Sequence, residues 1–217
     1  MRIFADSADV EEIKKLADLG FISGATTNPT LIAKAGGEPG EIYAQLANML
    51  EHVSAEVVAE DADGMYREGR ELSSIHPNIV VKIPFTPEGL KAVRRLKADG
   101  VRVNVTLIFS AAQALIAARV GADFVSPFIG RIDDIGYSGV DVIRQTAKIF
   151  TLHDISTQII AASIRHPAHF IEAALSGAHI GTVPPAVIWK LLKHPLTDIG
   201  LRRFLEDWRK LQESKGK

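Results

Sequence analysis

The sequence contains no cysteine, which excludes disulfides, thiolate nucleophiles and cysteine-ligated zinc. It also lacks an excess of one charge, because 25 lysines and arginines face 26 aspartates and glutamates. Charge therefore favours neither a nucleic acid nor an anionic membrane as a partner, and any affinity for anions must be local. No apolar run reaches membrane-spanning length, and MRIFADSADVEE turns acidic too early for a signal peptide. We therefore expect a cytoplasmic protein.

The composition that remains, 47% hydrophobic and 24% charged, is that of an ordinary globular protein. A chain of 217 residues can form one large domain or two small ones. Because no glycine-rich linker or low-complexity segment interrupts it, one domain is the simpler prediction.

Short apolar β-rich segments alternate with helical patterns along the chain, giving eight strand–helix units. An extra helix, at 41–53, lies between the second and third units, and 129–138 is predicted as a loop. Strands that are apolar on both faces are typical of parallel sheets covered by helices. Eight such units predict an α/β protein with a single (β/α)8 TIM barrel; a doubly wound open sheet is the alternative. The predicted strands are 2–5, 24–28, 55–59, 78–83, 101–108, 122–128, 157–163 and 178–183.

In such a barrel the chemistry lies at the carboxyl ends of the strands. Seven of the eight predicted strands carry polar or ionisable residues there, which is more regular than scattered surface residues would be. These residues are Asp6, Thr27, Asn28, Glu56, Lys82, Asn104, Thr106, Ser126, Ser163 and Arg165.

Lys82 stands inside an apolar run, HPNIVVKIPFT, where a charged amine is costly to bury. An apolar setting disfavours the ammonium form, and a neutral amine can attack a ketone to form a Schiff base. The alternative is a lysine that is ion-paired to Asp6 or Glu56 for structural reasons.

Asp6 and Glu56 offer the acid–base chemistry that would accompany such an amine. Cleaving a carbon–carbon bond in a 3,4-dihydroxyketone needs a base for the C4 hydroxyl, and carbinolamine breakdown needs an acid. Two carboxylates on different strands can divide these tasks. The alternatives are a helix N-cap for Asp6 and a solvated strand end for Glu56.

Arg131, Ser163 and Arg165 suggest an anion site, because guanidinium groups and hydroxyls suit phosphate oxygens. Against this, Arg131 could pair with Asp133 or Asp134, and Arg165 could be an exposed loop residue. The histidines of HPAH, at 166–169, have no third ligand nearby, so no metal is predicted.

Several segments resemble the transaldolases, especially the short bacterial and archaeal type, over nearly the whole chain. The group includes close relatives that act as fructose-6-phosphate aldolases. The segments are FADSA, ATTNPTL, VSAEVVA, VVKIPFT, NVTLIFS, FVSPFIGRIDDIG and AASIRHP.

The resemblance implies a role for each matching residue. It makes Lys82 the Schiff-base lysine and Asp6 the acid–base residue, and it implies that Glu56 and Thr106 hold the catalytic water. The implied substrate-binding residues are Thr27, Asn28, Asn104, Ser126, Phe128, Arg131, Ser163 and Arg165, the last three for the sugar phosphate.

The implied reaction is a ping-pong transfer of a dihydroxyacetone unit between sugar phosphates, a reaction of pentose phosphate metabolism, without metal or organic cofactor. Aldolase relatives carry glutamine in place of Glu56 and tyrosine in place of Phe128, so transaldolase is the prediction and aldolase the alternative. A catalytically silent sugar-phosphate-binding regulator would lack the nucleophile or the acid–base residue, and neither is missing here.

The C-terminal segment predicts one more amphipathic helix, which separates a barrel at 1–196 from a helix at 197–217. Its stripe must pack on its own barrel or on a neighbouring subunit. The resemblance implies pentameric or decameric homo-oligomers in which this helix reaches a neighbour. The stripe consists of Leu201, Phe204, Leu205, Trp208 and Leu211.

Overall fold

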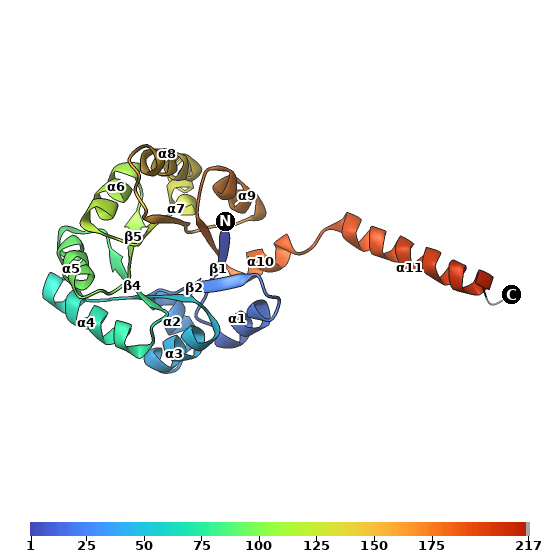
Figure 1. Ribbon diagram of the computed structural model, residues 1–217, viewed down its shortest axis with the longest axis horizontal. Coiled ribbons are helices and arrows are strands. Elements are labelled where there is room, and N and C mark those ends of the chain that lie inside the picture. The colour runs from blue at the N-terminus through green and yellow to red at the C-terminus, as the bar shows by residue number, and fades with distance from the viewer. Residues whose placement is uncertain (216–217) are drawn as a thin grey trace.

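The computed structural model describes residues 1–215 and places eight parallel strands in one closed barrel (Figure 1). The strands are β1 (Arg2–Asp6), β2 (Ile22–Thr26), β3 (His52–Glu56), β4 (Ile79–Pro84), β5 (Val103–Ile108), β6 (Phe124–Pro127), β7 (Gln158–Ala161) and β8 (Ile180–Val183). Each strand pairs with the next along the chain, and β8 closes the barrel by pairing with β1. The TIM barrel is confirmed, and the open sheet is excluded because it would leave two strand edges unpaired.

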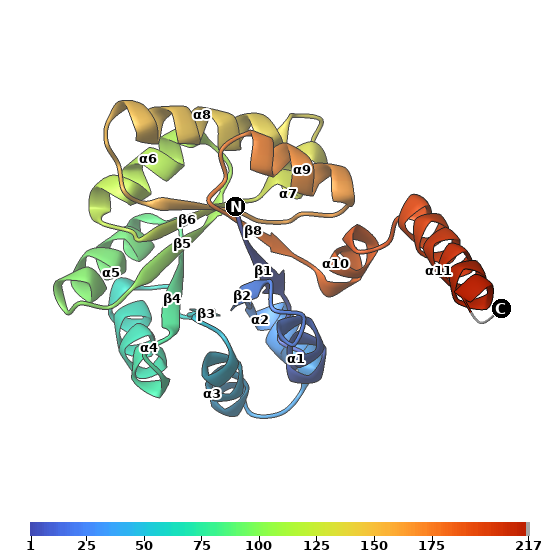
Figure 2. The ribbon, with the colours of Figure 1, turned by 45° about the vertical axis from the view of Figure 1, so that its right-hand side comes forward.

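Helices surround the barrel (Figures 1 and 2). They are α1 (Val10–Ala17), α2 (Pro29–Ala35), α3 (Pro39–Met49), α4 (Ala62–Ile75), α5 (Pro87–Ala98), α6 (Ala111–Val120), α7 (Ile129–Asp133), α8 (Gly139–Leu152), α9 (Pro167–Leu175) and α10 (Pro185–Leu191), and α11 (Pro195–Lys215) follows outside this ring. Many begin at a polar N-cap: the carboxylate of Asp9 accepts a hydrogen bond from the N–H of Glu12, and the Ser110 hydroxyl accepts one from the N–H of Gln113. These caps satisfy backbone donors that the first turn leaves open. The extra helix between the second and third units is present as α3.

Most predicted strand ends differ from the structure by one or two residues, and the larger errors are at three places. Helix α3 ends at Met49 rather than at residue 53, and β3 begins at His52 rather than at residue 55. Leu50 ends the helix in an extended conformation (φ −127°, ψ 148°) and is buried. The apolar residues around this junction fit both the helical and the strand period, so the pattern did not fix the boundary. The loop predicted after the sixth strand contains α7, a helix too short to show a period.

The barrel has apolar cores on both sides of its strands. The larger lies between the strands and the helices, where Ile13, Leu46 and Leu96 have no exposed surface. The smaller lies inside the barrel and consists of Phe4, Val80, Phe124, Ile160 and Ile180. Since side chains two positions apart on a strand point to the same face, residues further along these strands also point inward. The interior therefore changes from apolar to polar along the strands.

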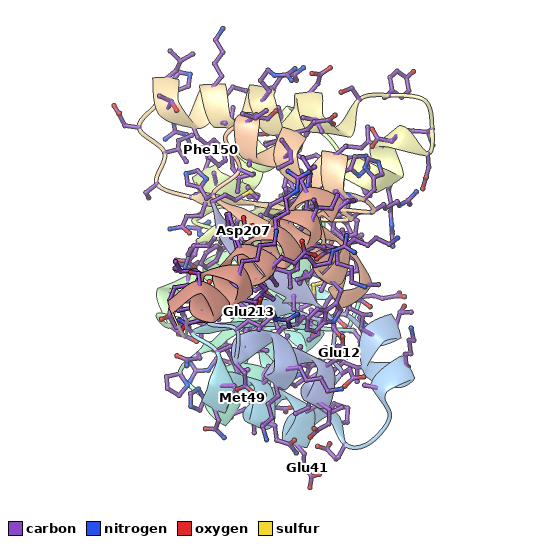
Figure 3. The ribbon with its side chains drawn as sticks, turned by 90° about the vertical axis from the view of Figure 1, so that its right-hand side faces the viewer. Glu12, Glu41, Met49, Phe150, Asp207 and Glu213 are labelled. Carbon is purple, nitrogen blue, oxygen red and sulfur yellow. The ribbon has the colours of Figure 1, made fainter. Side chains whose placement is uncertain are left out.

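Helix α11 extends away from the barrel (Figures 1 and 2). Figure 3 looks from the side on which it projects, with Asp207 and Glu213 labelled on it. Its apolar stripe is open, since Phe204 is 75% exposed and Trp208 59% exposed, so the stripe does not pack on its own barrel. Within residues 1–215, no helix is both long and apolar enough to cross a bilayer.

Candidate active site

Polar side chains line the interior of the barrel towards the carboxyl ends of its strands. The strand register places Glu56 beside Lys82 and Lys82 beside Asn104, so three neighbouring strands bring these groups to one level. On the neighbouring strands β1 and β2, Asp6 lies beside Thr26 in the same way. These inward-facing residues share one interior space, as alternation along barrel strands requires.

Lys82 is almost inaccessible, with 4% of the residue exposed. Its Nζ donates a hydrogen bond to the carbonyl oxygen of Thr27 at 2.9 Å and forms an ion pair with Oε2 of Glu56 at 3.0 Å. The predicted apolar setting is present on one side of the amine only. It is the apolar cluster inside the barrel, to which Val80, two positions before Lys82 on the same face of β4, belongs. The ion pair with Glu56, which the sequence left as an alternative, is present.

Asp6 ends β1, and Oγ1 of Thr26 donates a hydrogen bond to its Oδ1 at 2.8 Å. The Thr26 oxygen also lies 2.5 Å from Oγ1 of Thr182; since the one proton of Thr26 goes to Asp6, Thr182 is the donor of this second bond. Burial raises the pKa of Asp6 above its ordinary value, although the charge of Lys82 and the bond from Thr26 act the other way. Asp9 caps α1, so the N-cap alternative for Asp6 is wrong.

A cavity of about 110 Å³ joins these groups, with Lys82 and Asp6 both in its wall. Two larger hollows lie beside it: one of about 660 Å³ near α2, α3 and α4 reaches Glu56, and one of about 550 Å³ near α1, α2 and α10 reaches Asp6. We place the site in the small cavity because the amine and the carboxylate of Asp6 meet there. Its wall consists of Asp6, Thr26, Asn28, Lys82, Ser126, Phe128, Arg131, Ala162, Ser163 and Thr182.

Asn104, Ser126 and Thr106 are all buried in this polar region. The Ser126 hydroxyl donates a hydrogen bond to Oδ1 of Asn104 at 2.7 Å. The Thr106 hydroxyl is buried and makes no hydrogen bond with another residue of the described chain. Strand β5 is irregular just beyond it, and Leu107 has φ 57°, a conformation that leucine rarely adopts. The Thr106 hydroxyl is therefore available for a small polar partner.

Thr27 and Asn28 act on the site in different ways. The Thr27 side chain is fully buried and donates to the carbonyl oxygen of Ser54 at 2.8 Å, so Thr27 reaches Lys82 only through its own carbonyl group. Asn28 lines the cavity, and its Oδ1 caps α2 by accepting a hydrogen bond from the N–H of Leu31 at 2.9 Å. The amide nitrogen of Asn28 is not used in this cap.

The three residues predicted to bind an anion are only partly brought together. Arg131 and Ser163 line the cavity, and the guanidinium of Arg131 lies 5.0 Å from the centre of the Phe128 ring. Ser163 has φ 60°, in the left-handed region. Arg165 is outside the cavity wall and forms a two-pronged ion pair with Asp134. The alternative of a simple exposed ion pair therefore applies to Arg165 rather than to Arg131.

The two histidines of the HPAH segment make structural contacts. The His166 ring caps α9 by accepting a hydrogen bond from the N–H of His169, and Nε2 of His169 lies 2.9 Å from Oδ2 of Asp133. Nowhere in residues 1–215 do three histidine or carboxylate side chains gather as a metal site would require. These histidines hold the start of α9 against α7.

Sequence spacing did not single out His52, Ser54, Thr26 and Thr182, which all lie inside the barrel. Thr182 gives the eighth strand a polar group at the cavity. The Ser54 hydroxyl accepts a hydrogen bond from Nδ2 of Asn104 at 3.1 Å and lies 2.7 Å from Nε2 of His52. Counting back by two from Glu56 finds both Ser54 and His52 on the inward face. The predicted helix at 41–53 concealed this signal.

Comparisons with known proteins give consistent matches. The family model described as "Transaldolase/Fructose-6-phosphate aldolase" matches residues 3–215. A probable transaldolase of Clostridium acetobutylicum is 56% identical over 210 residues, 96% of this chain and 98% of that protein. Probable transaldolase 1 of Bacillus cereus is 56% identical over 214 residues, 98% of this chain and its own whole length. The similarity therefore covers both the barrel and α11.

Proposed function

The chain belongs to the transaldolase/fructose-6-phosphate aldolase family, and on that premise we propose that it is a transaldolase. It transfers a dihydroxyacetone unit from a ketose phosphate, such as sedoheptulose 7-phosphate or fructose 6-phosphate, to an aldose phosphate. The acceptor is erythrose 4-phosphate or glyceraldehyde 3-phosphate. The proposed chemistry needs neither a metal nor an organic cofactor.

One observation carries the proposal: a buried lysine amine and a carboxylate of raised pKa line the same small cavity, as Lys82 and Asp6. An amine can hold a ketone as a Schiff base, and the resulting iminium accepts the electron pair of a breaking carbon–carbon bond. A carboxyl group whose pKa is raised holds a proton more readily than an ordinary carboxylate, so it can both take and return one.

In the first half-reaction, Nζ of Lys82 adds to the C2 carbonyl of the ketose, and loss of water gives an iminium. The 3.0 Å ion pair supports Glu56 as the group that takes the proton from the amine. Asp6 then takes the proton of the C4 hydroxyl, and the C3–C4 bond breaks. The bonding electrons move onto C3 and into the iminium, leaving an enamine on Lys82, and the aldose departs with C4 as its aldehyde.

In the second half-reaction, C3 of the enamine attacks the aldehyde carbon of the acceptor. The new alkoxide takes the proton back from Asp6, and water hydrolyses the iminium to free the amine. The buried hydroxyl of Thr106, which has no hydrogen-bond partner within residues 1–215, supports its role, with Glu56, in holding that water.

The phosphate group is assigned to Arg131 and Ser163, which line the cavity. Arg165 joins them only if its ion pair with Asp134 opens, since that pair occupies both prongs of the guanidinium. We therefore rank Arg131 and Ser163 ahead of Arg165 in phosphate binding.

Fructose-6-phosphate aldolase activity is the second candidate, because the matching family includes both activities. Glu56 and Phe128 favour transfer, since the aldolases that this chain resembles carry glutamine and tyrosine there. A carboxylate and a phenyl ring place the catalytic water and its proton differently from an amide and a phenol. On this basis the enamine waits for an acceptor instead of being released.

The test is release of glyceraldehyde 3-phosphate from fructose 6-phosphate, with and without erythrose 4-phosphate. Sustained release only with the acceptor supports transaldolase, whereas sustained release without it identifies an aldolase. Borohydride reduction in the presence of fructose 6-phosphate should leave a covalent adduct at Lys82. Lys82→Met should abolish both adduct and transfer, and Lys91→Met, at an exposed lysine of α5, should retain both. An enzyme that transfers without an adduct at Lys82 contradicts the mechanism.

We also propose that the protein acts in the cytoplasm, in pentose phosphate metabolism, as a pentameric or decameric homo-oligomer. The open apolar stripe of α11 supports the oligomer, because a helix that leaves its own barrel with exposed Phe204 and Trp208 needs another surface to cover it.

A further inference from the structure

Four buried side chains form a continuous line of hydrogen bonds inside the barrel, from the cavity wall towards the apolar core. The Ser126 hydroxyl contacts Oδ1 of Asn104 at 2.7 Å, and Nδ2 of Asn104 contacts the Ser54 oxygen at 3.1 Å. The Ser54 oxygen lies 2.7 Å from Nε2 of His52. All four residues are at most 2% exposed. We call this line the serine–histidine relay.

The donors and acceptors of the relay run in one direction. Oδ1 of Asn104 can only accept, so Ser126 gives it its single proton. Nδ2 of Asn104 can only donate, so the Ser54 oxygen accepts and keeps its own proton for His52. The Ser54 proton is thus available to Nε2 of His52, 2.7 Å away, and we assign Nε2 as its unprotonated acceptor, with the imidazole proton on Nδ1. The relay therefore ends at a neutral histidine.

The surroundings of His52 keep it in that form. Its ring lies between the rings of Phe4 and Phe124, with centroids 4.7 Å away on each side. Burial, helped by the charges of Arg102 and Arg2, lowers the pKa of His52 to about 3. An imidazole in this apolar layer cannot become a donor at Nε2 by gaining a proton near neutral pH.

We propose that His52 is a positioning residue that fixes the hydrogen-bonding direction of the active site through the serine–histidine relay. By accepting from Ser54 it fixes the Asn104 amide, and the amide in turn takes the proton of Ser126. Ser126, which lines the cavity with Lys82, then presents only lone pairs to the substrate. The substrate unit held on Lys82 must therefore donate one of its hydroxyls to Ser126. This inference rests on the proposed function for its substrate, but the relay itself does not.

Neutron diffraction of the deuterated, substrate-free protein tests the direction of the relay without any assay. We expect deuterium on Nδ1 of His52, none on Nε2, and the Ser54 deuterium directed at Nε2. Deuterium on Nε2 would mean that His52 does not take the Ser54 proton and so does not fix the Asn104 amide, and it would overturn the proposal.

Kinetics test whether His52 acts through Ser126. His52→Phe keeps a ring in the aromatic layer and removes the acceptor, and we expect kcat for transfer to fall about tenfold, in line with leaving one buried donor unpaired. His52→Gln offers an amide oxygen in place of Nε2 and should recover most of that loss. The double variant with Ser126→Ala should lose no more than Ser126→Ala alone. Losses that multiply would show that the two residues act independently and would overturn the proposal.

Phe124→Leu is the matched control, because Phe124 contacts the same ring but makes no hydrogen bond in the relay. It should change thermal stability while leaving kcat within about threefold of the parent. If it lowers kcat as far as His52→Phe does, His52 has only a packing role. Borohydride trapping at Lys82 tests the proposed function separately. If the parent protein forms no adduct, the proposed function is wrong, and the neutron result still tests the relay.

Discussion

At the scale of single residues, burial decides which chemistry each polar group of the barrel can perform. Asp6 and His52 are titratable groups in the same interior, and burial favours the neutral form of both. For Asp6 the neutral form is the protonated one, and the group remains at the cavity, where it can exchange its proton. For His52 the neutral form leaves Nε2 as an acceptor within the apolar layer.

The first prediction concerns Asp6→Asn. Burial raises the pKa of Asp6 in the folded protein, so ionising this carboxyl costs the folded state more than the unfolded chain. Stability from this group is therefore greatest below the unfolded pKa of about 3.9 and falls as pH rises through the folded pKa. Asparagine keeps the acceptor for Thr26 and removes the charge, so the melting temperature at pH 7 should rise while transfer falls roughly 10²–10⁴-fold. Calorimetry and the coupled transfer assay measure both; a variant that is less stable at pH 7 contradicts the assigned pKa direction.

The second prediction follows from the lowered pKa of His52. Between its folded pKa of about 3 and its unfolded value of about 6.5, the unfolded chain binds a proton that the folded protein does not. Stability should therefore fall as pH drops through this window. His52→Gln should flatten the slope by up to about 1.4 kcal/mol per pH unit, as measured by urea unfolding at several pH values. His153→Gln, at an exposed histidine, should leave the slope unchanged; an equal slope in the parent and in His52→Gln would refute the burial of a neutral His52.

Single residues also show what the sequence could and could not predict. Lys82 was predictable because a lysine inside an apolar strand needs a reason. Its contact with the Thr27 carbonyl was not, because β2 and β4 are neighbours of β3 and not of each other, so the contact depends on barrel closure. The pairing of Asp134 with Arg165, instead of with Arg131 three positions away in the sequence, was not predictable either. Residues 31 positions apart meet only through the fold.

At the scale of elements, strand alternation carried most of the information about the site. Glu56 ends β3 in the structure even though the predicted strand was three residues late, because a period of two identifies the inward face from either boundary. Helix α7 had no such signal: with five residues it is shorter than two turns, and its place is fixed by contacts with the loop after β7.

The third prediction tests that contact. The N–H of Gly130 in α7 donates to the carbonyl oxygen of Ser163 at 3.2 Å, and a Cβ on Gly130 would lie 2.4 Å from that oxygen. Gly130→Ala must therefore displace the segment that carries Ser163. We expect kcat/KM for fructose 6-phosphate to fall roughly tenfold or more, because misplacing a binding group is costly. Unphosphorylated fructose should lose less, if Ser163 binds phosphate.

Gly40→Ala is the control for this variant, because a Cβ there meets only the flexible side chain of Glu38. It should leave the preference for the phosphorylated sugar unchanged. Equal losses for fructose and fructose 6-phosphate in Gly130→Ala would mean that Ser163 is displaced but does not bind the phosphate.

At the scale of the whole molecule, the barrel was predictable because eight repeated units leave few ways to bury strands that are apolar on both faces. The direction of α11 was not predictable from the chain itself. Its stripe follows the same periodicity as a helix that packs on its own barrel, and the pattern does not state which surface covers it. The structure shows that the stripe is exposed, so its own barrel is not the surface that covers it.

The last prediction concerns what covers that stripe. Deleting residues 197–217 should convert a pentamer or decamer into smaller species, down to a monomer of somewhat less than 23.5 kDa, by light scattering. Trp208→Glu should do the same with the helix present, because a carboxylate at the centre of an apolar contact loses its hydration without gaining a partner. Arg203→Glu introduces the same group on the opposite face of α11 and should leave the assembly intact. A chain whose mass is unchanged by both the deletion and Trp208→Glu does not assemble through α11. The exposed Phe204 and Trp208 would then belong to a contact with some other molecule.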